Sequence, residues 1–297
     1  MASALIIVNP AAGRGRVGKM LPEINRVIDK VARELEGLDV VRKLTDAPGH
    51  ALELAWAAPA GSRVVAVGGD GTLHEVVGGS ARSDKVVGMV PIGSGNDFAR
   101  MVGVYKLPLE QALRVALSGR VKKFDLPEVN GQPYGNSLGM GFDAEVARKA
   151  LSAPRMLRGL PRYLYSIFGV LKDLSLPELT LESEGKTLFQ GKALLAAVMN
   201  GRTYGAGIPI APPASPTDAL LTTVVAGEFS RLGVVGILPR LMSGKHLSHP
   251  HIHLNHAASF AVRFNRPVPA HADGELLKPA AVYQVKILPS ALQVAVG

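Results

Sequence analysis

The chain has 297 residues, of which 47% are hydrophobic, and it carries a net charge of +9 with an isoelectric point near 9.8. This length is enough for two domains with buried cores. The absence of cysteine excludes disulfides, a thiolate nucleophile and a cysteine-ligated metal. Basic character favours an anionic partner, but with only 5% aromatic residues the chain lacks the stacking platforms typical of nucleic-acid binding, so we expect no nucleic-acid partner.

The N-terminal part alternates apolar runs with helix-like stretches. Residues 5–8 are typical of a buried strand, and the basic, glycine-rich turn at 9–16 that follows suits phosphate. Helix-like segments at 20–35, 47–57 and 109–117 then predict parallel βαβ units. The first residues include no basic region and no apolar run of about 18 residues occurs, so we expect neither a signal peptide nor a membrane span, and a cytoplasmic protein.

Two further strand-like runs also end in glycines. Residues 64–67 lead directly into Gly-Gly-Asp-Gly at 68–71, and residues 86–92 lead into a polar loop at 93–98. Glycines let a polyphosphate approach the backbone amides, and Asp70 is placed to hold Mg²⁺. Because parallel strands end at one edge of a sheet, we expect these loops to converge on one ligand. A tight strand-to-helix turn without a ligand needs the same residues.

The pattern changes after residue 125. Strand-like runs at 180–184, 193–199, 220–225 and 260–264 are separated by Gly and Pro turns, which predicts a mainly antiparallel β domain. We therefore expect an α/β nucleotide-binding domain with a parallel sheet over residues 1–125, and a second, β-rich domain over 126–283.

Taken together, the motifs resemble the diacylglycerol kinase catalytic family of bacterial lipid kinases and sphingosine kinases, whose nucleotide domain is related to those of NAD kinase and phosphofructokinase. They follow the family order across nearly the whole chain. Two positions depart from the family pattern: His74 replaces Asn, and Ala219 replaces Gly. The motifs are Gly-Gly-Asp-Gly at 68–71, Thr45 with Gly49-His50-Ala51, residues 137–143, Asn200-Gly201, residues 218–220 and Asp273-Gly274-Glu275.

The resemblance implies an ATP-dependent, Mg²⁺-requiring kinase that phosphorylates a lipid hydroxyl, with diacylglycerol-like or sphingoid alcohols as the leading acceptors. It also implies that the last strand, about 284–288, and the tail to residue 297 pack onto the first domain, which leaves 126–283 as the lipid-substrate domain. An apolar cleft between the domains is the expected place for the acceptor. The implied nucleotide-binding residues are Asn9, Thr45, Gly69, Asp70, Gly71, Thr72, Leu73, His74, Glu75 and Ser94, with Asp97 in the adjoining loop.

Two acidic segments are candidates for the chemistry. By resemblance, Asp273 is the general base that accepts the acceptor's hydroxyl proton, and Glu275 is its companion; Asp70 completes the catalytic set. An Asp-Gly hairpin turn without catalysis is the alternative. Asp218, with backbone carbonyls at Ser215 and Leu220, matches a structural Mg²⁺ site, although Asp is also an ordinary turn residue. Replacement of Gly by Ala at 219 matters only if that residue needs a positive φ.

The histidines invite a metal interpretation that we do not favour. Five of them lie at 246–256, and on a strand His249, His251 and His253 would share one face. Pro250 interrupts such a strand and no carboxylate lies between them, so a basic surface loop is favoured over zinc. His74, one turn into the helix after Gly-Asp-Gly, either faces the nucleotide or packs the start of that helix.

Residues 148–172 hold six basic residues and no acidic one, which are Arg148, Lys149, Arg155, Arg158, Arg162 and Lys172. Within them, the segment 157–174 has helical apolar spacing, so it either lies on an anionic bilayer or, the favoured interpretation, packs on its own domain. We expect peripheral membrane contact, and we leave a homodimer open. The alternatives for function are an NAD kinase-like enzyme and a nucleotide-binding regulator without catalysis, which the retention of Asp70 and Asp273 disfavours.

Overall fold

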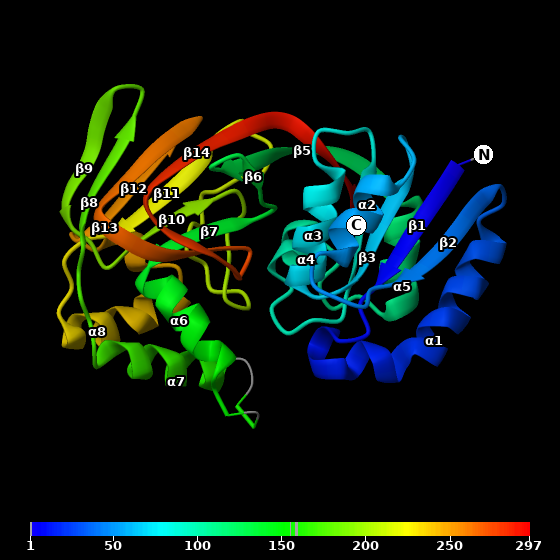
Figure 1. The fold of residues 1–297 in the computed structure, drawn as a ribbon, viewed down its shortest axis with the longest axis horizontal. Helices are drawn as coiled ribbons and strands as arrows, with labels where there is room; N and C mark the ends of the chain where they lie inside the picture. The colour runs from blue at the N-terminus through cyan, green and yellow to red at the C-terminus, as the bar shows by residue number, and fades with distance from the viewer. Residues whose placement is uncertain (1, 155, 158–159) are drawn as a thin grey trace. The chain divides into compact units, whose positions relative to one another are not determined.

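A computed structural model describes residues 2–154, 156–157 and 160–297, and the chain divides into two compact units (Figure 1). Unit 1 comprises Met1–Leu126 and Pro289–Gly297, and unit 2 comprises Pro127–Leu288. The sequence predicted divisions after residue 125 and at about residue 284. No helix in the described part of the chain is long and apolar enough to cross a bilayer.

Unit 1 is built on a parallel sheet. Its strand order is β2-β1-β3-β4, and the end of β14 is added beside β4 through Gln293 and Val294. β1, β3 and β4 carry buried apolar residues on both faces, as a sheet covered by helices on both sides requires, whereas the edge strand β2 is largely exposed. The bounds are β1(Ala2–Val8), β2(Leu38–Leu44), β3(Arg63–Gly68), β4(Val86–Pro91) and β14(Glu275–Val296).

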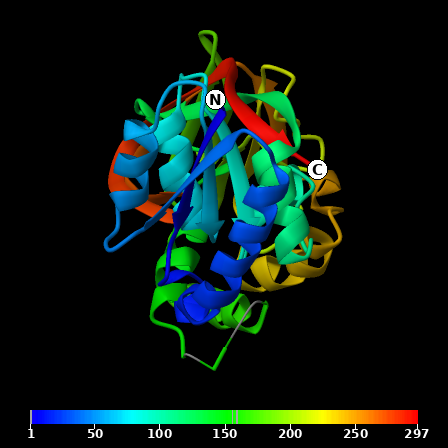
Figure 2. The same cartoon turned by 90° about the vertical axis from the view of Figure 1, so that its right-hand side faces the viewer.

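Helices cover both faces of this sheet, which lies between them in Figure 2. α1(Ala12–Glu34) and α5(Leu109–Ser118) share one core cluster with β1, β3 and β4, because apolar residues recur along each helix at the spacing of one face. α2(His50–Ala57) and α3(Asp70–Ser80) pack against each other and contact β1 and β3. The short α4(Asp97–Met101) follows β4.

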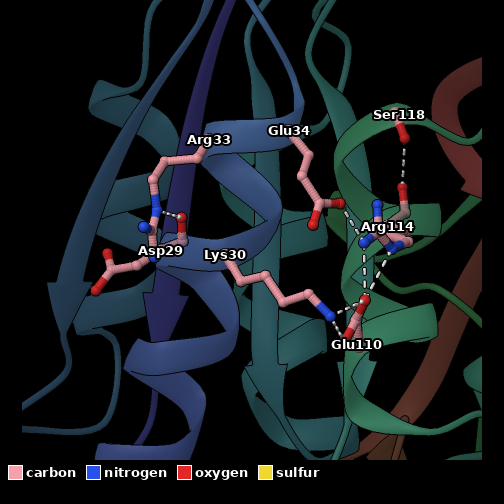
Figure 3. Close-up of polar contacts among 7 residues, drawn as sticks. All are labelled: Asp29, Lys30, Arg33, Glu34, Glu110, Arg114 and Ser118. Carbon is pink, nitrogen blue, oxygen red and sulfur yellow. Dashed lines mark hydrogen bonds and ion pairs between the residues drawn. The ribbon is translucent and has the colours of Figure 1, made fainter.

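A network of surface ion pairs joins α1 to α5 (Figure 3). Lys30 Nζ lies 2.9 Å from Glu110 Oε2, and Arg114 lies 2.7 Å from Glu110 Oε1. Arg114 also pairs with Glu34 at the end of α1. The network fixes the two helices beside each other on the solvent side of their shared core.

Unit 2 is built on antiparallel strands. The order is β12-β11-β10-β7-β13-β14, with the β8–β9 hairpin paired to β13, and the short β6 paired to β5, which itself pairs with β14. A parallel sheet followed by antiparallel strands is the arrangement that the sequence predicted, and it is confirmed. The bounds are β5(Arg120–Val129), β6(Gln132–Pro133), β7(Ser137–Gly141), β8(Glu178–Ser183), β9(Lys186–Lys192), β10(Leu195–Met199), β11(Leu221–Ala226), β12(Ile252–Ala257) and β13(Ser259–Ala272).

Three helices of unit 2 gather on one side of its strands in Figure 1. They are α6(Phe142–Leu151), α7(Leu160–Leu171) and α8(Arg231–Met242), and they share an apolar cluster with residues from the ends of β10 and β11. A single 3₁₀ turn, η1(His246–Ser248), precedes β12. The predicted last strand, 284–288, is much longer than expected, because β14 continues extended from unit 2 into unit 1.

Candidate functional site

The strand order of unit 1 reverses between β1 and β3, so the connections from these two strands leave the carboxyl edge of the sheet in opposite directions, and this is the point where open α/β sheets bind ligands. Asn9 directly follows β1 and spans this point. Its Nδ2 donates to Thr72 Oγ1 at 3.0 Å, and its Oδ1 accepts from the Ala11 N–H at 3.0 Å. The Asn9 side chain thus ties the end of β1 to the start of α3, as convergence of the loops requires.

The turn after β1 depends on glycine. Gly13, Arg14 and Gly15 have φ values of 60°, 61° and 81°, which interrupt the helical backbone at the start of α1. A Cβ on Gly13 would lie 2.8 Å from the carbonyl oxygen of Ile92, at the end of β4. Glycine therefore permits the close approach of the first and third of the predicted loops.

The loops after β3 and β4 touch through their glycines, and Asp70 holds them together. A Cβ on Gly93 would lie 2.5 Å from the Cα of Gly69. The Asp70 carboxylate accepts the Asn96 N–H at 2.6 Å on Oδ2 and the Asp97 N–H at 2.9 Å on Oδ1. Asp70 therefore fixes the 93–97 loop at the start of α4, a positioning contact that the sequence did not predict.

Other residues of the expected nucleotide set lie in different surroundings. Glu75 accepts the N–H groups of Gly49 and Ala51, each at 2.9 Å, and so caps the start of α2. Leu73 is buried in the core, His74 is half-buried in the first turn of α3 and Ser94 is exposed. The Thr45 N–H continues the ladder at the end of β1 by donating to the Val8 carbonyl at 2.9 Å. Asp97 is buried, with Oδ1 3.7 Å from Arg100 Nε.

A cavity of about 420 Å³ lies in unit 1 beside this edge. Arg16 and Lys106 contribute cationic side chains to its lining, and the backbone of 91–93 and Asn96 contribute polar groups. Its volume lies within the range of small-molecule sites. The cavity lies on the α1 and α5 side of the sheet, away from Glu75.

In unit 2, Asp273 and Gly274 form a two-residue hairpin turn between β13 and β14. Their φ values are 53° and 91°, and Ala272 pairs with Glu275 across the turn, the pattern of a type I′ hairpin. The Asp273 carboxylate accepts three backbone N–H groups: that of Gly135 at 2.7 Å and those of Asn136 and Ser137 at 2.8 and 3.0 Å. These bonds fix the carboxylate against the start of β7, whereas Glu275 is exposed at the start of β14.

The charge of Asp273 affects the pKa of the neighbouring Tyr134 phenol. Burial, and then the charge of Asp273, raise the pKa of Tyr134 well above its ordinary value. Tyr134 is fully buried, and its hydroxyl remains protonated at neutral pH.

The predicted metal segment forms an exposed turn. Asp218 Oδ1 accepts the Leu220 N–H at 3.0 Å, and Ala219 between them has a φ of 60°. The replacement of the family's Gly by Ala219 therefore affects the backbone, because this residue adopts the left-handed conformation that Gly prefers. The donors available, one carboxylate and the carbonyls of Ser215 and Leu220, are oxygen atoms and fit Mg²⁺ in type. Within the described residues, no three His, Asp or Glu side chains cluster as a metal site.

The histidines are dispersed over several elements. Of the three histidines that would share one face of a continuous strand, only His253 lies on a strand, because β12 begins at Ile252; the interruption expected at Pro250 is confirmed. His249 and His251 instead lie around Phe229, with ring centroids 5.0 and 5.7 Å from it. Burial, then the charges of His251 and Arg240, lower the pKa of His249. His253 and His256 lie on β12, and His246 lies in η1.

Within the segment 157–174, Leu160–Leu171 form α7, and the apolar face of this helix packs on its own unit, as the favoured interpretation held. Ile167 and Leu171 are buried in the cluster with α6 and α8. Arg162 Nε donates to the Ala150 carbonyl at 2.8 Å, so this guanidinium caps the end of α6. Phe168 is exposed. Arg155 and Arg158, which the sequence placed in the basic segment, lie outside the described residues.

A second cavity, of about 50 Å³, lies within unit 2 beneath α7 and α8. Its lining is almost entirely apolar, including Phe142, Ile167 and Val234, but Asp143, Tyr163 and Tyr204 give it one polar end. Burial, and then the Asp143 charge, raise the pKa values of Tyr163 and Tyr204, so both hydroxyls remain proton donors. Sequence reasoning named Asp143 within a motif but assigned it no role.

Comparisons with known proteins agree with this architecture. Residues 3–129 match the family model of the diacylglycerol kinase catalytic domain, and residues 136–296 match that of the YegS C-terminal NAD kinase beta sandwich-like domain. A diacylglycerol kinase of Bacillus subtilis is 28% identical over 279 residues, which cover 93% of this chain and 90% of that protein. A diacylglycerol kinase of Mycobacterium tuberculosis is 27% identical over 296 residues, 97% and 93% of the two chains. The family resemblance is confirmed.

Two solved structures share the fold. That of a diacylglycerol kinase from Bacillus anthracis superposes with a TM-score of 0.72 at 20% identity and covers 99% of this chain and 97% of that one. An NAD kinase from Archaeoglobus fulgidus in complex with ATP gives a TM-score of 0.55 at 12% identity over 98% and 93%. At these identities the likeness concerns the fold alone.

Proposed function

Because the chain belongs to the diacylglycerol kinase catalytic family, we propose that it is a lipid kinase that transfers the γ-phosphoryl group of ATP to a lipid hydroxyl. The observation that carries the proposal is that the two family models match in chain order, the catalytic domain over most of unit 1 and the second domain over most of unit 2. The relatives named diacylglycerol kinase support a diacylglycerol-like acceptor, with sphingoid alcohols as the second class.

The carboxyl edge of the sheet in unit 1 is the proposed ATP site. The glycine contacts at Gly13, Gly69 and Gly93 expose backbone near the point where the strand order reverses, which is where nucleotide phosphates bind in open α/β sheets. Asp70 holds the 93–97 loop there, and we assign it to the Mg²⁺-nucleotide as well. When bound, Mg²⁺ would neutralise charge on the transferring phosphoryl group. Asp218, with its carbonyl neighbours, is the proposed site for a structural Mg²⁺.

Asp273 is the proposed general base. A base must be held in one orientation toward the hydroxyl whose proton it accepts, and three backbone N–H bonds supply that restraint. The hairpin geometry and the catalytic role are compatible, since a type I′ turn presents its first residue at the tip of the two strands. Glu275, exposed beside the turn, is the proposed companion.

The small cavity of unit 2 is the proposed entry for part of the lipid chain. Its apolar walls suit an alkyl chain, and its volume of about 50 Å³ has room for only one or two groups the size of water. Binding a longer chain therefore requires the lining side chains of α7 and α8 to move. The exposed side chains of Leu151, Met156 and Phe168 would meet the surface of an anionic membrane.

The test is transfer of label from γ-labelled ATP in the presence of Mg²⁺. The acceptors are diacylglycerol, monoacylglycerol, ceramide, sphingosine and phosphatidylglycerol in mixed micelles, with NAD⁺ as a further acceptor. We expect label in at least one lipid and none in NAD⁺. Label in NAD⁺ alone would replace the proposal with an NAD kinase, and turnover of no acceptor would favour a nucleotide-binding regulator.

A further inference from the structure

We propose that His271 and Asp143 are positioning residues that anchor the hairpin carrying Asp273. The inference rests on the proposed function, in which Asp273 is the base, and it assigns a role to two buried titratable residues that the proposed mechanism does not use. His271 and Asp143 are only 5% and 4% exposed. They come from different elements, β13 and the first turn of α6.

The contact between His271 and the turn determines which ring nitrogen carries the proton. The Gly274 N–H donates to His271 Nδ1 at 3.3 Å, so Nδ1 presents a lone pair and the proton of the neutral ring lies on Nε2. Nε2 lies 3.7 Å from Asp143 Oδ2. This separation is longer than a hydrogen bond, but in a buried environment the carboxylate still attracts the N–H dipole and orients the ring.

Asp143 is itself held in place. Its Oδ1 accepts the Ala144 N–H at 2.9 Å, and its Oδ2 accepts the Tyr204 hydroxyl at 3.2 Å. The Tyr204 ring also packs edge-on against the His271 ring, with centroids 5.9 Å apart. The imidazole is therefore restrained by a carboxylate, by an aromatic ring and by the turn amide.

Gly139 makes this arrangement possible. In the pairing of β7 with β13, Gly139 is directly opposite His271. A Cβ at position 139 would lie 2.0 Å from Asp143 Oδ2 and 2.6 Å from His271 Nε2. Any larger residue at position 139 would push the Asp143 and His271 side chains apart. Glycine is therefore required here by the close approach of these two side chains and not by its φ.

The contacts form one continuous path from α6 to the proposed base. Asp143 orients His271, His271 accepts from Gly274, and Gly274 is the second residue of the turn whose first residue is Asp273. Asp143 and Tyr204 also line the apolar cavity of unit 2. The path therefore joins the cavity that would receive the lipid chain to the turn that would act on the lipid hydroxyl.

The experiment compares His271→Ala with His271→Asn, because the Asn amide oxygen takes the place of Nδ1 as acceptor for the Gly274 N–H. We measure kcat and KM for ATP and for diacylglycerol in mixed micelles, and hydrogen exchange of the amides at 271–276. A displacement of about 1 Å at a catalytic group costs roughly 10²-fold in rate. We expect kcat to fall roughly 10- to 10²-fold in His271→Ala, with KM for ATP within about twofold, and to stay within about threefold of wild type in His271→Asn.

Exchange separates this inference from the proposed function. Turn amides should exchange faster in His271→Ala and remain protected in His271→Asn. Asp143→Ala should lower kcat in the wild-type background and by less in the His271→Asn background, where no ring remains to be oriented. His256→Ala on β12, whose Nδ1 lies 3.0 Å from Thr222 Oγ1, is the matched control and should leave both measurements unchanged.

Each outcome is decisive. If His271→Ala has the kcat and the amide exchange of wild type, His271 does not anchor the turn, and the proposed lipid kinase activity is unaffected by that result. Equal defects in His271→Asn and His271→Ala would also overturn it, since the acceptor at Nδ1 would then not be what matters. If the wild-type protein labels no lipid, the proposed function fails, and the exchange comparison alone still decides whether His271 anchors the turn.

Discussion

At the scale of single residues, Asp273 and Asp70 should separate chemistry from nucleotide binding. In Asp273→Asn the base is lost, so kcat should fall by roughly 10² to 10⁴, while the ATP Kd changes little because the proposed phosphate loops lie in unit 1. In Asp70→Asn an amide nitrogen faces one of the two N–H donors of the 93–97 loop, so ATP affinity should fall along with the rate. The measurements are kcat and ATP Kd for both variants.

Circular dichroism and thermal unfolding are the controls for these two variants, because each carboxylate also accepts backbone hydrogen bonds. If a folded Asp273→Asn protein keeps more than about a tenth of the wild-type rate, the loss of rate is too small for a general base. Asp273 would then be a hairpin residue only.

Ala219 carries a backbone strain that a single substitution relieves. Its φ of 60° costs an L-residue about 1 kcal/mol, whereas Gly adopts it freely but gains about 0.4 to 1 kcal/mol of unfolded-state entropy. Ala219→Gly should therefore raise the free energy of unfolding by about 0 to 0.6 kcal/mol, while Ala219→Val should lower it. Urea unfolding measures both. Equal destabilisation by Gly and Val would contradict the strain argument.

At the scale of elements, the packing of α2 on α3 makes neighbouring glycines unequal. A Cβ on Gly79 would lie 2.3 Å from the Leu52 carbonyl oxygen, which belongs to rigid helical backbone. A Cβ on Gly78 would lie 3.2 Å from Leu52 Cδ1, the end of a flexible side chain. Gly79→Ala should destabilise by about 1 to 3 kcal/mol, whereas Gly78→Ala should be neutral or gain up to about 1 kcal/mol of helix propensity.

The comparison of the two variants has a functional readout, because α3 begins at Asp70. Gly79→Ala should weaken ATP binding along with stability, and Gly78→Ala should leave both close to wild type. Equal urea midpoints for the two variants would mean that α2 moves away from α3 at little cost.

The ion pairs between α1 and α5 should make stability depend on pH. Hydrogen bonds from Arg114, and then from Lys30, lower the pKa of Glu110. A carboxyl whose pKa is lower in the folded state stabilises the fold above its unfolded value, near pH 4.3, and this contribution is lost as the pH falls through the folded value. Glu110→Gln should therefore be less stable than wild type at pH 7, and the difference should shrink well below pH 4 and at high salt.

Urea midpoints at pH 7 and pH 3 measure this effect. Glu23→Gln, at an exposed position on α1, the other helix that the network joins, is the matched control and should give a smaller difference at pH 7. A Glu110→Gln difference that persists unchanged at pH 3 would assign the effect to packing and not to charge.

At the scale of the whole molecule, the sequence revealed the strand endings better than the contacts between distant segments. The parallel unit was predictable because the runs at 64–67 and 86–92 are apolar throughout and end in glycines. The Asp143–His271 pair was not, because only the register of β7 against β13 brings those residues together. The two hydrogen bonds that Glu75 accepts from the start of α2 were likewise not predictable, since they depend on how α2 packs against α3.

The last prediction concerns where the positive charge of the chain meets a membrane. Each basic residue near an anionic surface contributes about 1 kcal/mol, so replacing both Arg155 and Arg158 with Gln should weaken binding to acidic vesicles by roughly tenfold or more. Arg162 is kept, because its contact with the Ala150 carbonyl caps α6. Changing Leu151 and Phe168, 71% and 51% exposed, to Ser should weaken binding further.

Co-sedimentation with vesicles of phosphatidylglycerol and phosphatidylcholine, at low and at physiological salt, gives the measurement. The matched control is Lys122→Gln with Lys123→Gln, which removes the same charge from exposed positions on β5. If the membrane face is specific, the variant with Arg155 and Arg158 replaced must lose much more vesicle binding than the Lys122 and Lys123 control. The loss must also be largest at low salt, where charges are least screened. Equal losses in the two pairs would mean that net charge alone attracts the protein to the surface, and wild-type binding after the changes of Leu151 and Phe168 to Ser would exclude these exposed residues of α6 and α7 from membrane contact.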